Sequence, residues 1–174
     1  MQNKNVSIWK IDPTHSEVSF KVKHMMISTV TGNFEKFDAQ TESADDDFQN
    51  AKFNFSAETA SVNTNNQDRD NHLKSDDFFG AEAHPELTFT SKSFDGEMIV
   101  GDLTIKGVTK TIELDAEYNG TVVDPYGQTK AGFEFEGQIS RKDFGLNWNT
   151  VTEAGGIVVS DKVRMIVSLQ FVKQ

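Results

Sequence analysis

Four histidines, His15, His24, His72 and His84, are the side chains of this 174-residue chain best suited to general-base or metal chemistry. A metal site needs several ligands that converge, and neither an H-x-H nor an H-E-x-x-H spacing occurs. The pair at helical spacing, Asp68 and His72, is more typical of a solvated surface than of a site. The chain has no cysteine, which excludes disulfides, thiolate zinc sites and a cysteine nucleophile. These residues predict neither a metal site nor a catalytic centre.

His24 is the histidine whose neighbours favour a binding role. It ends an apolar row in which every second residue is hydrophobic, and two flexible thioethers, Met25 and Met26, follow it. Such an imidazole suits the mouth of a pocket, and the plainer alternative is a hydrogen-bonded structural histidine. If the chain were an enzyme acting on an apolar substrate, His24 would be its general base. If it bound haem or a metal, His24 and Met25 or Met26 would be the ligands.

Two arginines are candidates for contact with an anion. Arg69 lies beside Asp68 and Asp70, so we expect carboxylates to hold it buried as a lock over one end of the fold. The alternative is an anion site, because guanidinium groups bind phosphate bidentately. Arg141 is a second basic point, and the sequence favours neither role for it.

Alternation of apolar and polar residues dominates the rest of the chain and predicts strands with one buried face. The clearest runs are 18–24, 51–57, 87–90, 103–106, 112–118, 131–139 and 163–171, and the weaker ones are 8–11 and 32–40. Turn signals separate the runs at Asp95-Gly96, Lys106-Gly107, Asn119-Gly120 and 124–127. This spacing is typical of an antiparallel meander.

One segment, 66–79, lacks the alternation and predicts a short helical segment, with Ser75 or Asp76 capping a further turn. We expect a single all-β domain over residues 1–174, closed as an antiparallel barrel of about eight strands. The chain has 14 phenylalanines, and several inward positions are small. Large rings beside small residues leave either a tunnel or, in the plainer case, a solid core.

Composition restricts the partners. Lys and Arg number 17 against 27 Asp and Glu, so the net charge is −10, and no basic patch suggests nucleic-acid binding. No apolar run approaches the length of a transmembrane helix, so we expect no integral membrane segment. The first ten residues, MQNKNVSIWK, have no signal-peptide core. We therefore expect a cytoplasmic protein, or a periplasmic one if this is a processed form.

Several motifs in a fixed order resemble those of the YceI-like family, from about Trp9 to Phe171. The most specific is R-D-x-x-L-K-S-x-D-F-F at 69–79. The others include W-x-I-D-x-x-H-S at 9–16, S-V-x-T at 61–64, H-P at 84–85, G-x-L-T-I-x-G-V-T-K at 101–110 and R-x-D-F-G-L at 141–146. Each motif is weak alone, and their shared order makes chance similarity improbable.

The resemblance implies a lipocalin-like barrel with a tunnel that holds an isoprenoid lipid, either a polyprenyl phosphate or a quinone. It implies a carrier without cofactor or catalysis, and members of the family often form homodimers. The residues expected to line the tunnel are Phe20, Val22, His24, Met25, Met26, Phe34, Phe53, Phe55, Phe78, Phe89, Leu103, Ile105, Phe133, Phe135, Phe144, Trp148 and Met165. His24, Arg69 and Arg141 are the candidates for contact with the head group.

Overall fold

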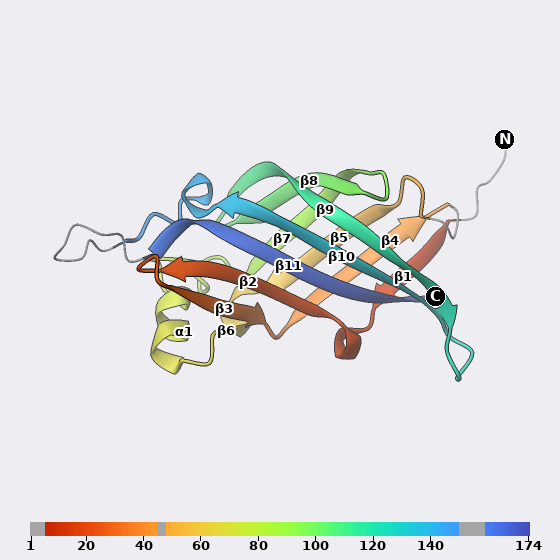
Figure 1. The fold of residues 1–174 in the computed structure, drawn as a ribbon, viewed down its shortest axis with the longest axis horizontal. Helices are drawn as coiled ribbons and strands as arrows, with labels where there is room; N and C mark the ends of the chain where they lie inside the picture. Colours follow the sequence, from red (N-terminus) through yellow and green to blue (C-terminus); the bar gives the residue numbers. More distant parts are fainter. Residues whose placement is uncertain (1–5, 45–47, 150–158) are drawn as a thin grey trace.

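The computed structural model describes residues 6–44, 48–149 and 159–174, and almost all of its regular structure is antiparallel sheet. The described strands are β1 Ser7–Ile11, β2 Glu17–His24, β3 Ser28–Phe34, β4 Phe37–Ser43, β5 Lys52–Glu58, β6 Val62–Asn63, β7 Glu86–Phe94, β8 Met98–Ile105, β9 Val108–Val123, β10 Thr129–Ser140 and β11 Val159–Lys173. Figure 1 shows them as an elongated barrel with the long strands running along its axis. The predicted fold class is confirmed.

Closure depends on β11, which has more than one neighbour on the same edge. In the order β1-β4-β5-β7-β8-β9-β10-β11, eight strands close when β1 pairs with the carboxyl end of β11. The earlier part of β11 pairs instead with β2, which carries β3 and β6 outward as an extension. β1 and β2 thus lie end to end along β11, and a 3-10 turn, η1 (Pro13–His15), separates them. This branching leaves the β2–β3 hairpin at one end of the barrel (Figure 1).

Three of the four predicted turns lie between strands as expected, and the prediction of the fourth is wrong. Asn119-Gly120 lies inside β9, where Gly132 pairs with Gly120 and Phe133 pairs with Tyr118. The extra residue makes a β-bulge, and Gly120 has a φ of 113°, which its missing side chain permits. The same dipeptide therefore bends a strand here instead of ending it.

The helical segment is shorter than predicted. The helix α1 spans Gln67–Lys74, and its N-cap is Asn66, whose side chain accepts a hydrogen bond from the backbone N–H of Arg69 at 2.9 Å. Ser75 is the C-cap of α1 and caps no further helix, since residues 76–79 form turns. Two other short 3-10 turns are η2 (Thr59–Ser61) and η3 (Arg141–Phe144).

Away from α1 the barrel is solid and aromatic. The Phe133 ring is fully buried and has five aromatic neighbours with ring centres 4.9 to 6.0 Å away: Phe48, Phe53, Phe94, Tyr118 and Phe171. The contacts between Phe133 and Phe48, Phe53, Phe94 and Phe171 are edge-on, which suits the charge distribution of aromatic rings. Trp9 joins the cluster through Phe48, at 4.9 Å. We call this group the aromatic floor, because the barrel is hollow on its other side.

Candidate functional site

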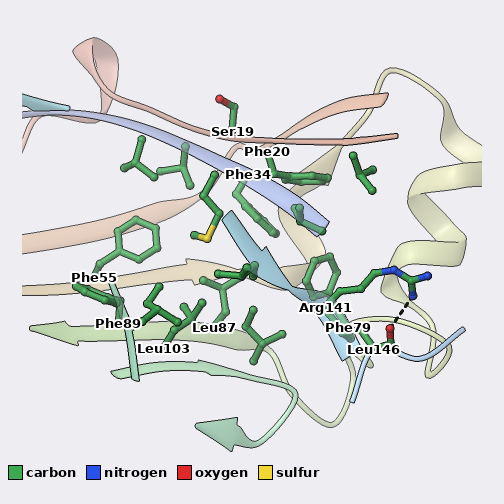
Figure 2. A pocket seen from close by; sticks show the side chains of 18 of the residues that line it. Ser19, Phe20, Phe34, Phe55, Phe79, Leu87, Phe89, Leu103, Arg141 and Leu146 are labelled. Atoms are coloured by element: carbon green, nitrogen blue, oxygen red, sulfur yellow. Dashed lines mark hydrogen bonds between the residues drawn. The ribbon is translucent and has the colours of Figure 1, made fainter. Parts of the chain in front are cut away.

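A cavity of about 300 Å³ occupies the half of the barrel between the aromatic floor and α1. Its walls are overwhelmingly aliphatic and aromatic (Figure 2). Phe55, Phe89 and Leu103 lie at the end away from the helix, and Phe79 and Arg141 lie at the helix end. The predicted residues on its wall are Phe20, Val22, His24, Phe34, Phe53, Phe55, Arg69, Phe78, Phe89, Leu103, Ile105, Phe135, Arg141, Trp148 and Met165.

Four residues predicted to line the tunnel lie elsewhere. Met25 and Met26 form an exposed turn after β2, with 43% and 68% of their surface accessible. Phe133 is in the aromatic floor, and Phe144 is a buried residue of η3 that is not on the cavity wall. Alternation along a strand predicts which face a side chain takes, but it does not predict how far along the barrel axis the side chain lies.

The prediction also missed part of the wall. Leu87, Leu114, Ile139, Val163, Leu169 and Phe171 belong to strand rows already assigned to the inward face, so their alternation was a sufficient signal. Three further wall residues are Leu73, which lies in α1, Phe79, which lies in the turn after α1, and Leu146, which follows η3. These three carry no periodic signal, although they stand within the sequence motifs.

The described ionisable side chains on the wall gather at the helix end, and all of them are of the basic type. They are Lys23, His24, Arg69, His72 and Arg141, and no carboxylate is among the described lining residues. Lys23 and Arg69 are exposed, which marks the place where the cavity reaches solvent. In a chain with a net charge of −10, this end of the cavity therefore favours an anion.

Arg141 is the buried member of this set, with 3% of its surface accessible. Its Nε donates to the Ser160 carbonyl at 2.8 Å, Nη1 donates to the carbonyls of Leu146 and Trp148 at 2.6 and 2.7 Å, and Nη2 donates to the Val159 carbonyl at 3.0 Å. Burial lowers the pKa of the guanidinium, and the charge of Asp161 opposes that shift. Four of its five N–H groups are thus used to join the segment after η3 to the start of β11.

Arg69 is held differently from the expected lock. It is exposed, and it binds Thr64 instead of a carboxylate: Nε donates to Thr64 Oγ1 at 2.7 Å and Nη2 to the Thr64 carbonyl at 2.6 Å. The Asp70 carboxylate accepts hydrogen bonds from the backbone N–H and the hydroxyl of the same Thr64. Thr64 therefore fixes both side chains, and among the described residues the remaining guanidinium N–H groups of Arg69 have no hydrogen-bond partner.

His72 also lies at the helix end, and its partner is not Asp68. Nε2 lies 2.8 Å from Oδ2 of Asp77, beyond the end of α1. The imidazole packs edge-on against Trp148 at 4.6 Å and Phe78 at 5.0 Å. These contacts place a half-buried imidazole and the two rings together on the rim of the cavity.

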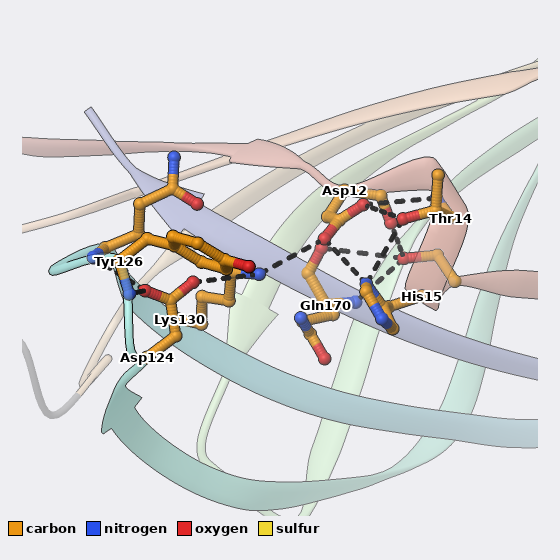
Figure 3. Close-up of polar contacts among 9 residues, drawn as sticks. Asp12, Thr14, His15, Asp124, Tyr126, Lys130 and Gln170 are labelled. Atoms are coloured by element: carbon orange, nitrogen blue, oxygen red, sulfur yellow. Dashed lines mark hydrogen bonds and ion pairs between the residues drawn. The ribbon is translucent and has the colours of Figure 1, made fainter.

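The other polar cluster of note lies outside the cavity (Figure 3). Asp12 accepts hydrogen bonds from the hydroxyl and backbone N–H of Thr14, contacts His15 Nδ1 at 2.9 Å and lies 3.5 Å from Lys130 Nζ. Lys130 also contacts Asp124 at 3.2 Å. The Thr14 hydrogen bond, with help from His15, lowers the pKa of Asp12 to about 2 despite partial burial. The cluster ties η1 to the β9–β10 hairpin and has the character of a structural staple.

In the ranges 6–44, 48–149 and 159–174, no three His, Asp or Glu side chains converge as metal ligands. Within the same ranges, no helix has the length and apolar character needed to span a membrane.

A closed antiparallel barrel with an apolar cavity reaching solvent at one end defines a lipocalin-like protein of the ligand-binding type. The chain belongs to the YceI-like family, whose domain model matches residues 9–171.

Known relatives span nearly the whole chain. A UPF0312 protein of Staphylococcus epidermidis is 40% identical over 164 residues, which are 94% of this chain and 96% of that protein. The solved Campylobacter jejuni YceI protein is 35% identical with a TM-score of 0.70 and covers 100% of this chain and 99% of its own. A domain from Saccharophagus degradans, described as polyisoprenoid-binding, has a TM-score of 0.71 at 17% identity and covers 95% of this chain and 98% of its own, so it shares the fold.

Proposed function

We propose that this protein is a non-enzymatic carrier of an isoprenoid lipid whose anionic head group sits at the helix end of the cavity. The observation that carries the proposal is the division of the cavity wall. Its interior is apolar as far as the aromatic floor, and its described ionisable groups are basic and gathered at the solvent end. An amphiphile with a branched hydrocarbon tail and a phosphate-like head matches both parts.

The hydrocarbon tail of the lipid supplies most of the binding free energy. Each Å² of apolar surface that it buries contributes about 25 cal/mol, without specific contacts. Flexible and aromatic side chains such as Met165, Phe34 and Phe89 adapt to methyl-branched chains. A volume of about 300 Å³ is at the lower end for ligand pockets, so a long chain would leave its head and adjoining units at the rim.

The head group of the lipid meets two kinds of cation. Arg141 already donates its hydrogen bonds to backbone carbonyls, so it attracts the head group mainly through its positive charge. Arg69 and His24 remain available to donate, and both lie on the wall at the solvent end. The polyisoprenoid-binding domain from Saccharophagus degradans supports the choice of tail through its shared fold.

The two alternatives have less support from the geometry. A general base at His24 would need an acid or an orienting carboxylate nearby, and the described lining residues include none. Haem ligation inside the cavity by His24 with Met25 or Met26 would need thioethers on the wall, and both methionines lie outside it.

A titration with geranylgeranyl phosphate and with geranylgeraniol tests the proposal, because the two share a tail and differ in the head. Trp148 lies on the cavity rim and Trp9 in the aromatic floor. Trp148 fluorescence in a Trp9→Phe background therefore reports binding. We expect the phosphate to bind about tenfold more tightly, and Arg69→Gln to remove most of that difference while leaving the alcohol unchanged. Equal affinities would contradict the anionic head group, and no binding of either ligand would contradict the carrier function.

A further inference from the structure

The turn between β2 and β3 exposes three consecutive apolar residues beside the cavity. We call Met25–Ile27 the apolar tip. Met25, Met26 and Ile27 have 43%, 68% and 84% of their surface accessible. Single exposed apolar residues are ordinary, but an exposed run of three is a cost in solubility that usually reflects a function.

The backbone of the apolar tip is also strained. Met25 and Met26 have φ values of 53° and 59°, in the left-handed region that side chains other than Gly, Asn and Asp rarely adopt. Asn-Gly is the pair that supplies two successive positive φ angles in tight hairpins. The β9–β10 hairpin, by comparison, turns through Asp124 and Gly127, and Asp124 accepts two backbone hydrogen bonds. The apolar tip thus holds methionine where turn chemistry favours small polar residues.

The position of the apolar tip links it to the cavity. His24, directly before it, lies on the cavity wall, as do Val22 and Val30 on the two strands that it joins. Ser160 Oγ donates to Met26 Sδ at 3.1 Å, which holds the tip against the start of β11. In Figure 1 the β2–β3 hairpin and α1 lie at the same end of the barrel.

The chain segment that carries the apolar tip has a charge opposite to that of the whole chain. From Val18 to Phe34 the chain contains Lys21 and Lys23 and no carboxylate, although the net charge of the protein is −10. Both lysines are exposed on β2. An apolar tip with lysines behind it matches a lipid bilayer, which offers hydrocarbon below a layer of phosphates. Three side chains are too few for a stable protein interface, which buries about 800 Å² on each partner.

We propose that the apolar tip inserts into the surface of a phospholipid bilayer and brings the rim of the cavity against it, so that the lipid passes between bilayer and barrel without crossing water. This rests on the proposed function, since a barrel without a lipid cargo would have no reason to dock in this way. In this proposal Met25 and Met26 contact the bilayer and do not line the cavity.

Flotation with vesicles of phosphatidylcholine and phosphatidylglycerol in equal parts tests the inference with the full chain. We expect the wild type to float with the vesicles and Met26→Asp/Ile27→Asp to partition at least tenfold less. The matched control is Val122→Asp/Val123→Asp in β9, where the valines are 66% and 67% accessible at the opposite end of the barrel. This control should partition like the wild type. A wild type that does not float, or equal losses in both double variants, would overturn the inference.

A turn-optimised variant keeps the test independent of folding defects. Met25→Asn/Met26→Gly suits the left-handed backbone, so we expect a higher thermal midpoint together with vesicle partition at least tenfold weaker. Unchanged partition would overturn the inference. Titration with geranylgeranyl phosphate in the absence of vesicles separates the two proposals, because the tip variants should bind it as the wild type does. A wild type that does not bind geranylgeranyl phosphate would overturn the carrier function instead.

Discussion

The ring of Phe53 lies 5.3 Å from the ring of Phe133, at an interplanar angle of 81°, and this contact is where the hollow part of the barrel ends. Phe53 is on the cavity wall, whereas Phe133 is not. Behind them Phe48 and Phe94 fill the barrel with further ring contacts. The length of chain that the cavity accepts is therefore limited by aromatic side chains and not by the length of the strands.

Substitutions at two buried alanines test whether the cavity has room for a larger side chain. Ala39 lies on the cavity wall, and Ala131 lies in the solid part of the core, with 5% and 1% of their surface accessible. Ala39→Leu should fill empty volume, leave the free energy of unfolding nearly unchanged and weaken lipid binding. Ala131→Leu should overpack the core and lower the free energy of unfolding by about 1–3 kcal/mol. Urea unfolding of both variants measures the difference, and equal destabilisation would mean that Ala39 faces no usable space.

Gly101 supports the cavity wall through a close approach that a side chain would prevent. A Cβ at this position would lie 2.5 Å from Cζ of Phe89 and 2.6 Å from the carbonyl oxygen of Thr90. The ring could move, but the backbone oxygen on the paired strand could not move cheaply. Gly101→Ala should therefore lower the free energy of unfolding by about 1–3 kcal/mol and shift Phe89 within the cavity. Thermal unfolding checks the first effect, and a wild-type melting curve would contradict it.

The strands could be predicted from the sequence because one face of each is buried. Val18, Phe20, Val22 and His24 alternate with polar residues, and all four lie on the cavity wall. The depth of a side chain could not be predicted in this way. Phe133 and Phe135 share a face of β10, but Phe135 reaches the cavity and Phe133 the aromatic floor. That difference depends on strand tilt and on which rings arrive from distant strands.

Side-chain contacts with residues beyond the ends of the helix could not be predicted from the sequence either. Helical spacing suggested Asp68 as the neighbour of His72, but the turn after Ser75 brings Asp77 to it instead. Arg69 was expected to bind carboxylates because its sequence neighbours are acidic. The short strand β6 places Thr64 within 2.7 Å of its Nε, and Asp70 binds Thr64. Such contacts follow from the path of the backbone between elements, which local spacing does not determine.

Arg141 and Arg69 should respond differently to substitution. Arg141→Met would leave four carbonyl groups near the start of β11 without their donor, so we expect the free energy of unfolding to fall by about 3 kcal/mol or more. Arg69→Gln, at an exposed site, should cost less than about 1 kcal/mol and mainly reduce affinity for a phosphate head group. Chemical unfolding and lipid titration on the same samples separate the two effects. A stable Arg141→Met variant with weakened phosphate binding would contradict this assignment.

Asp12 makes stability depend on pH in the acid range. Its pKa is about 2 in the folded protein against an ordinary value of 3.8, so the carboxylate stabilises the fold above pH 4. That contribution is lost as the pH falls from about 4 to 2. Asp12→Asn keeps a capping oxygen and removes the charge, so it should cost about 1–2 kcal/mol at neutral pH. Unfolding measured from pH 7 to pH 2 should show the stabilities of the two proteins converging as the pH falls from about 4 to 2, and a constant difference would contradict the role of the charge.

Native mass spectrometry of the purified protein, followed by extraction and identification of the bound lipid, decides whether this barrel carries an isoprenoid lipid. We expect a species heavier than the bare chain by several hundred daltons, and an extract that contains a polyprenyl chain bearing an anionic head group. After delipidation, added polyprenyl phosphate should restore the heavier species in the wild type and not in Ala39→Leu. A bare mass that added polyprenyl phosphate does not change would contradict the carrier function.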